Sequence, residues 1–162
     1  MAIAVPRPVA ATGNTWTYVG NRPSDVVSRW PHWDYQTYNV EDLAVGHVRF
    51  DGGAVMQIEA SFAAHVEQDV WNFTLAGEKG GANWDPATIF TDRHGTMVNE
   101  TPAFLPEGGF QELFPLKLRH FVDSVLNDTP LEAPGEAGLA VQKILDGVYR
   151  SAAAGGREVP IE

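Results

Sequence analysis

The chain has 162 residues, a length that suits one compact domain. Its formal net charge of −10 and its 11 scattered Lys and Arg residues argue against nucleic acid or an anionic membrane as a partner. The sequence has no cysteine, which excludes disulfides and thiolate sites, and we expect a cytoplasmic protein. No apolar run approaches the length of a membrane span, and residues 1–6 lack the features of a signal peptide.

The first part of the chain predicts one strand followed by an irregular segment. Residues 9–19 are rich in Thr, Val and aromatic residues, which favour a β-strand. Residues 20–39 show no clean period, and we interpret them either as a loop packed on the core or as part of a pocket wall. This segment gathers several aromatic side chains and one histidine, namely Trp30, His32, Trp33, Tyr35 and Tyr38.

Residues 41–64 predict a long β-hairpin around Asp51-Gly52-Gly53, because these residue types accept the backbone angles of a tight turn. If Phe50 lies opposite Ala54, one face of the hairpin is apolar and the other is mixed, and a slip of one residue would mix the two sets. The pairs expected on the apolar face are Val48 with Met56, Gly46 with Ile58 and Ala44 with Ala60.

The mixed face of this hairpin has two interpretations, which the sequence leaves open. It is either a solvated sheet face, as antiparallel sheets often have, or a subunit interface or pocket floor. Its polar residues are His47, Arg49, Gln57, Glu59 and Ser61, and they are accompanied by Val45 and Val55.

The segment from residue 66 to residue 101 predicts further antiparallel strands. Residues 66–76 alternate in character and predict a strand, residues 77–81 a hairpin turn, and residues 82–85 the return strand. Residues 88–92 and 97–99 predict another short hairpin around Arg93-His94-Gly95.

Two helices follow, and a short strand ends the chain. Apolar residues at helical spacing predict a helix over 114–125, in which Pro115 is acceptable only in the first turn. A second helix is predicted from about 136 to 154, with Gly138 and Gly147 each costing about 1 kcal/mol relative to Ala. Close packing on the sheet would offset this cost. The expected stripe of the second helix is Ala137, Val141, Ile144 and Val148, and residues 158–161 predict an edge strand.

This order of elements predicts the fold class. Strands followed by helices indicate a single α+β domain, residues 1–162, with two layers: a mostly antiparallel open sheet and helices packed on one face. The apolar hairpin face should meet the helices, and its residues are Val48, Phe50, Met56, Ile58 and Phe62.

No local motif predicts an active site. The glycines of residues 77–81 lack the Gly-Lys-Ser/Thr of a phosphate loop, and the sequence contains neither GxSxG nor HExxH. The five histidines match no metal-ligand spacing. Glu41 and Asp42 are adjacent on an expected strand, so they should point to opposite faces and not share one acid/base task. The residues themselves therefore predict no catalytic, cofactor-binding or metal site.

Three segments resemble the C-terminal domain of the Gfo/Idh/MocA oxidoreductases, the relatives of glucose-fructose oxidoreductase and inositol dehydrogenase. They are YNVEDLAVGHVRFDGGAVMQIEASFA, VWNFTLAGEKGGANWD and FVDSVLNDTPLEAPGEAGLAVQKILDGVYRSAAAGGREVPI. The resemblance implies the fold of the C-terminal domain of glyceraldehyde-3-phosphate dehydrogenase-like proteins. It also implies a partner Rossmann domain that binds NAD or NADP, and hydride transfer to or from sugars, inositols and related polyols or aldehydes.

The sequence departs from the family pattern at the catalytic and cofactor motifs, since it has no GxGxxG, no Glu-Lys-Pro and no Asp-x-x-x-His. We therefore expect a C-terminal substrate and oligomerisation domain that is inactive alone, with NAD or NADP bound by the parent protein. In that case the candidate substrate-binding residues are Trp30, His32, Trp33 and Tyr35. The candidate interface of a homo-oligomer is the mixed face, with His47, Arg49, Gln57, Glu59 and Ser61.

Two other hypotheses remain open from the sequence. The first is a self-standing, non-enzymatic binding or assembly module that uses the same sheet. The second is a small cofactor-free enzyme with His32 as its base, for which the sequence offers no evident partner.

Overall fold

The computed structural model describes residues 6–23, 34–104 and 110–162. The chain divides into two units, residues 1–65 with 130–162 and residues 66–129. The first unit contains the strands β1 (Pro8–Trp16), β2 (Leu43–Phe50), β3 (Val55–Ser61) and β8 (Val159–Pro160), with the helix α2 (Gly135–Ala153). The second contains β4 (Thr74–Gly77), β5 (Gly80–Asn83), β6 (Thr88–Arg93), β7 (Thr96–Glu100) and the helix α1 (Phe110–Asn127).

The β2–β3 hairpin has the register that the sequence predicts. Val48 pairs with Met56, Gly46 with Ile58 and Ala44 with Ala60. A short 3₁₀ turn, Asp51–Gly53, joins the strands, and the Phe50 N–H donates to the Ala54 carbonyl at 2.9 Å. Gly52 and Gly53 have φ angles of 79° and 89°, a region that favours glycine. The turn and the alternation of side chains thus fix the same pairing.

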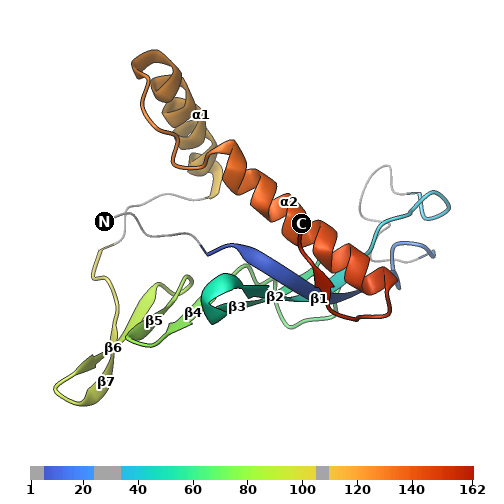
Figure 1. Cartoon of the computed structure of the whole chain (residues 1–162), viewed down its shortest axis with the longest axis horizontal. Coiled ribbons are helices and arrows are strands. Elements are labelled where there is room, and N and C mark those ends of the chain that lie inside the picture. The colour runs from blue at the N-terminus through green and yellow to red at the C-terminus, as the bar shows by residue number, and fades with distance from the viewer. Residues whose placement is uncertain (1–5, 24–33, 105–109) are drawn as a thin grey trace. The chain divides into compact units, whose positions relative to one another are not determined.

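The helix α2 lies across one face of the sheet of the first unit, whose strand order is β3-β2-β1-β8 (Figure 1). Gly13 and Gly46 pair on adjacent strands and leave room for Val148 of the helix. Gly147 of the helix also lies close to the sheet, because a β-carbon there would lie 3.2 Å from the Ala11 Cβ. The resulting core contains Ala11, Val48, Ile144 and Val148, with Phe50, Met56, Ile58 and Ile161 packed around it.

This core confirms most of the expected contacts between the helix and the hairpin, and three expectations are corrected. Ala137 and Val141 are exposed, since only the part of α2 from Ile144 onward is buried against the sheet. Phe62 is 42% exposed because it follows the end of β3 and stacks edge-on to Tyr38. A β-carbon at Gly138 would meet no atom within 4 Å, so close packing accounts for Gly147 and not for Gly138.

The second unit is a four-stranded antiparallel sheet in the order β4-β5-β6-β7, together with α1. The hairpin turns lie within the predicted segments, at residues 78–79 and at His94-Gly95. The return strand β5 is Gly80–Asn83 instead of residues 82–85, because Gly80 and Gly81 already pair with β4. The expected strand 66–76 is much shorter, because only Thr74–Gly77 enters the sheet. The Asn72 side chain accepts from the Asp85 N–H and donates to the Asp85 carbonyl, which replaces pairing between the strands there.

Two other boundaries differ from the sequence-based expectation. The strand β1 ends at Trp16 instead of residue 19, since the next backbone N–H groups bond to a side chain, as described below. The helix α1 begins at Phe110, so Pro115 lies beyond its first turn, where it leaves one backbone carbonyl without its helical donor. The apolar stripe of α1 belongs to the second unit, and its contact with the hairpin face stays a prediction.

The α+β class with antiparallel sheets is therefore confirmed. In the described residues the strands form two four-stranded sheets, where the sequence predicts one, and α2 covers one face of the first. The other face of that sheet carries no helix of its own unit among the described residues and is the first candidate for function.

Candidate functional site

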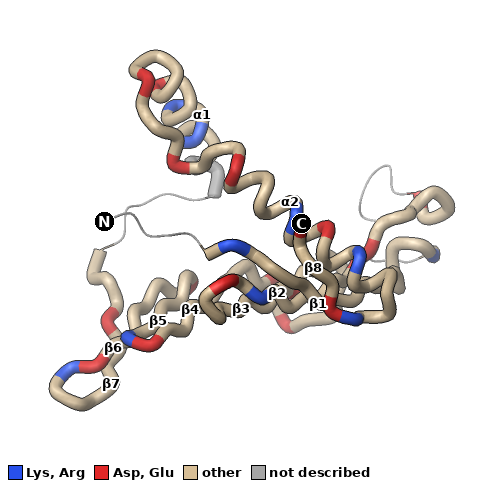
Figure 2. The backbone as a smooth tube through the Cα atoms, in the orientation of Figure 1, with Lys and Arg blue, Asp and Glu red and all other residues tan. Residues whose placement is uncertain are grey.

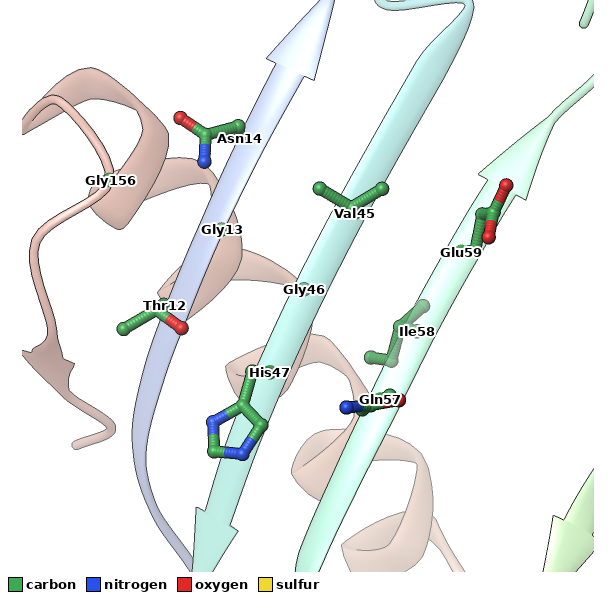
Figure 3. Close-up of a pocket in the computed structure, with 10 residues that line it drawn as sticks. All are labelled: Thr12, Gly13, Asn14, Val45, Gly46, His47, Gln57, Ile58, Glu59 and Gly156. Atoms are coloured by element: carbon green, nitrogen blue, oxygen red, sulfur yellow. The ribbon is translucent and has the colours of Figure 1, made fainter.

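The open face of the first sheet carries two polar rows across β1, β2 and β3. Thr12, His47 and Gln57 form one row, because Thr12 pairs with His47 and His47 with Gln57. Asn14, Val45 and Glu59 form the next row by the same pairing. Figure 3 shows these six side chains on the side of the sheet that faces away from the helix. The alternation of the strands thus produces a face of hydrogen-bonding groups opposite the apolar core.

This open face is hollowed. A depression of about 500 Å³ lies over the two rows, and Gly156 contributes to its edge. Its polar side chains are an alcohol, two amides, an imidazole and a carboxylate, and Val45 and Ile58 add apolar lining. Such a surface can accommodate either a polar ligand or a second protein surface.

An ion pair borders the polar rows. The Arg49 guanidinium donates two hydrogen bonds to the Glu158 carboxylate, at 2.8 and 2.7 Å. This ion pair crosses over β1 at the buried residue Ala10. Ala10 pairs with Arg49 on one side and with Pro160 on the other. The hydrogen bond from Arg49 lowers the pKa of Glu158, and the same bond raises the pKa of Arg49. The pair lies in solvent, so its main effect is to hold Arg49 in one orientation.

The five residues of the predicted interface all belong to this part of the sheet, although one of them has a local task. His47, Arg49, Gln57 and Glu59 lie on the open face. The Ser61 hydroxyl donates to the Asp42 carbonyl at 2.6 Å and accepts the N–H groups of residues 63 and 64. Ser61 therefore stabilises the turn after β3, and the interface role of the whole set stays a prediction.

The predicted substrate-binding segment is only partly described. Trp30, His32 and Trp33 lie outside the described residues. Tyr35 lies in a turn that Asp34 holds, since the Asp34 carboxylate accepts the Gln36 N–H at 3.0 Å. The Tyr35 side chain is 39% exposed, so it is available for contact.

Asp42 is a buried charge whose role sequence reasoning missed. Its side chain is 1% exposed, and its oxygens accept the backbone N–H groups of Tyr18, Val19 and Gly20 at 2.7–3.1 Å. Burial alone would raise the pKa of this carboxyl, but hydrogen bonds from these three N–H groups and from the Asp42 N–H outweigh burial and lower it. No local sequence signal reveals such bonds, because they join residues 22–24 positions apart.

The Glu41 side chain binds a different group from that of Asp42, as expected for adjacent residues that point to opposite faces. The Tyr149 hydroxyl of α2 donates to a Glu41 carboxylate oxygen at 2.6 Å. This hydrogen bond raises the pKa of Tyr149, with burial and the negative charge of Glu41 adding to it. The two neighbouring carboxylates thus hold different elements and do not converge on one reacting bond.

The glycine-rich segment of residues 77–81 does not form a phosphate-binding loop, and the described residues hold no cluster of metal ligands. Gly80 and Gly81 lie in the β4–β5 hairpin, where β-carbons would come within 2.6 Å of the carbonyl oxygens of Phe90 and Leu75. These glycines therefore permit close strand packing and do not open a helix toward a pyrophosphate. In residues 6–23, 34–104 and 110–162, no three His, Asp or Glu side chains gather as metal ligands.

The sequence argues against a membrane span and against clustered basic residues, and the structure can be compared with both expectations. Within the part of the chain that the structure describes, no helix has the length and apolarity to cross a membrane. Lys and Arg residues are interspersed with Asp and Glu along the backbone of both units (Figure 2).

Comparison with known proteins identifies the family. Residues 9–161 match the family described as "Oxidoreductase family, C-terminal alpha/beta domain" (GFO_IDH_MocA_C). The D-glucoside 3-dehydrogenase of Escherichia coli (strain K12) is 26% identical over 156 residues, which are 96% of this chain and 43% of the relative.

Solved structures agree in fold. Levoglucosan dehydrogenase in complex with NADH has a TM-score of 0.76 at 19% identity, over 96% of this chain and 45% of that one. The aldose-aldose oxidoreductase from Caulobacter crescentus, complexed with glycerol, has a TM-score of 0.66 at 20% identity, over 96% of this chain and 42% of that one. The chain spans less than half the length of these relatives. It belongs to the Gfo/Idh/MocA oxidoreductase family, and it contains that family's C-terminal α/β domain.

Proposed function

We propose that the chain is the substrate and oligomerisation domain of an NAD(P)-dependent oxidoreductase that acts on a sugar, an inositol or a related polyol or aldehyde. The observation that carries this proposal is the family match over residues 9–161, in a chain that spans under half of its relatives. Hydride transfer requires a bound nicotinamide, and the sequence lacks the GxGxxG motif with which Rossmann domains bind one. The domain is therefore inactive alone and works with a Rossmann domain of the parent protein.

The names of the relatives support the substrate class. One relative acts on D-glucosides, one solved structure is of a levoglucosan dehydrogenase, and another is of an aldose-aldose oxidoreductase. An aromatic side chain can stack on the apolar face of a sugar ring while its polar edge bonds to a hydroxyl group. Trp30, His32, Trp33 and Tyr35 are the proposed wall of the sugar pocket, and Tyr35 is the exposed member of this set among the described residues.

The open sheet face is the proposed contact between two copies of the chain. A two-fold contact needs a surface that is complementary to itself, and this face carries both donors and acceptors. The face carries His47, Arg49 and the carboxylate of Glu59. Groups of opposite charge from two copies can therefore meet across a two-fold axis. The apolar Val45 and Val55 add area that a contact would bury.

A change of charge on this face tests the contact. Arg49→Glu combined with Gln57→Glu places two new carboxylates on the open face of each copy and should make the copies repel. The measurement is the molar mass by light scattering, where we expect the wild type above its monomer mass of 17.7 kDa and the variant at that mass. Lys143→Glu on α2 is the control, because it changes the charge by −2, against −3 for the double variant, at a position away from the open face. Equal masses for the variant and the wild type would count against the interface.

A further inference from the structure

The loop that joins β1 to β2 begins and ends at one buried carboxylate. Asp42 is the last residue before β2, and its side chain binds the N–H groups of Tyr18, Val19 and Gly20, which follow β1. Successive backbone N–H groups that converge on one anion form a nest, an arrangement suited to a carboxylate. The carboxylate of Asp42 thus ties the first residues of the loop to its last residue.

Other contacts strengthen the same junction. The Asp42 N–H donates to the Trp16 carbonyl at 2.9 Å, and the Thr17 hydroxyl donates to the Val40 carbonyl at 2.9 Å. The Tyr38 ring lies against Gly20 so closely that a β-carbon there would collide with it. The Tyr38 hydroxyl donates to the Glu41 carbonyl at 2.9 Å. The two limbs of the loop are therefore packed side by side at their base.

Hydrogen bonds also hold the turn that contains Tyr35, at the described end of the loop. The Thr37 N–H donates to the Asp34 carbonyl at 3.3 Å, and the Thr37 hydroxyl bonds to the Asp34 carboxylate at 3.1 Å. Tyr35 lies within this turn and is exposed, and Tyr38 follows it by three residues. A rotation at the base would thus move Tyr35 as well.

We propose that Asp42 is a positioning residue, which holds the β1–β2 loop in the orientation that presents Tyr35 to the substrate. The proposal rests on the proposed function for the part that concerns the substrate. Asp42 does not contact the substrate in this account; it acts through the loop. A side chain that is fixed before binding loses less conformational freedom on binding, so the anchor should improve affinity for the sugar.

Limited digestion with trypsin tests the anchor directly. Arg22 and Arg29 are the only Lys or Arg residues from 21 to 41, and Pro23 follows Arg22, which blocks cleavage there. Release of the two described ends of the loop should therefore raise the rate of cleavage after Arg29. We expect Asp42→Ala to raise the rate of this cleavage about tenfold or more, because it leaves three buried N–H groups without their acceptor. Glu41→Gln, at the adjacent position, should leave the rate near that of the wild type.

Chemical rescue separates loss of the anchor from general damage to the fold. Formate supplies a carboxylate that can occupy the nest, so it should slow the cleavage of Asp42→Ala and leave the wild-type rate unchanged. Asp42→Asn serves as the second variant if Asp42→Ala does not fold, and it should show a smaller rise, since its amide keeps one acceptor oxygen. Cleavage of a folded Asp42 variant at the wild-type rate, or no response to formate, would overturn the anchor.

A titration with myo-inositol, followed by intrinsic tryptophan fluorescence, tests the role toward the substrate. We expect Asp42→Ala to bind this polyol several-fold more weakly than the wild type, and formate to restore the affinity. Faster cleavage with unchanged affinity would overturn the positioning role. If the wild type binds neither myo-inositol nor D-glucose, the proposed function of the pocket wall fails, while the trypsin result still decides the anchor.

Discussion

Gly13→Ala tests whether α2 is seated on the sheet as the structure describes. A β-carbon at position 13 would lie 2.6 Å from the Val148 Cγ1 atom and 2.9 Å from the Val45 carbonyl oxygen. Carbon atoms in favourable contact are about 3.5–4.0 Å apart, so the helix or the strand must move. Overpacking of a buried site costs about 1–3 kcal/mol. Alanine also restricts the unfolded chain more than glycine does, which stabilises the folded protein by about 0.4–1 kcal/mol. The expected sum is a net loss of stability.

Urea denaturation of single and double variants measures this effect. Gly13→Ala should lower the free energy of unfolding by about 1.3 kcal/mol, the difference between the middle values of the two contributions above, about 2 and about 0.7 kcal/mol. In a Val148→Ala background the cost should be smaller by about 0.5 kcal/mol or more, because the colliding methyl group is absent. Gly138→Ala is the control, since its β-carbon meets nothing within 4 Å, and it should stabilise α2 by about 1 kcal/mol. A neutral Gly13→Ala, or an equal cost in both backgrounds, would refute this packing.

Two further predictions concern the buried carboxylate and the second unit. Asp42→Asn should lower the free energy of unfolding by about 1–3 kcal/mol at neutral pH. Because the pKa of Asp42 is lowered in the folded protein, this contribution is present above the unfolded pKa of about 3.9 and is lost as the pH falls through the lower folded value. Urea midpoints at several pH values check this, and a difference between variant and wild type that persists unchanged at the acid end would contradict it. Gly81→Ala should destabilise the β4–β5 hairpin by about 1–3 kcal/mol, because its β-carbon would lie 2.6 Å from the Leu75 carbonyl oxygen. Amide hydrogen exchange in β4 and β5 measures this, and unchanged protection would show that the strands are not so close.

The hairpin of β2 and β3 shows what the sequence can predict in this protein. Its register follows from two local properties, the alternation of side chains and the turn residues Gly52 and Gly53. The helix α2 follows in the same way from its apolar spacing, although that spacing does not reveal that only its second half meets the sheet.

The contacts that shape the candidate site have no local signature. The Arg49–Glu158 pair joins residues 109 positions apart, and Asp42 collects N–H groups from the other end of a long loop. Asn72 ends a strand early by bonding to Asp85, although the alternating pattern around it favours continuation. Each of these depends on which segments the fold brings together, so the residues alone predict the open face but not its borders.

Titration of the 162-residue chain with NADH and NADPH by calorimetry tests the central claim most directly. We predict no heat of binding at micromolar nucleotide, because the sequence lacks GxGxxG and the glycines of residues 77–81 pack between strands. Levoglucosan dehydrogenase, whose complex with NADH is known, is the positive control under the same conditions. Binding of either nucleotide to this chain with micromolar affinity would contradict the assignment of a substrate and oligomerisation domain that depends on a separate cofactor domain.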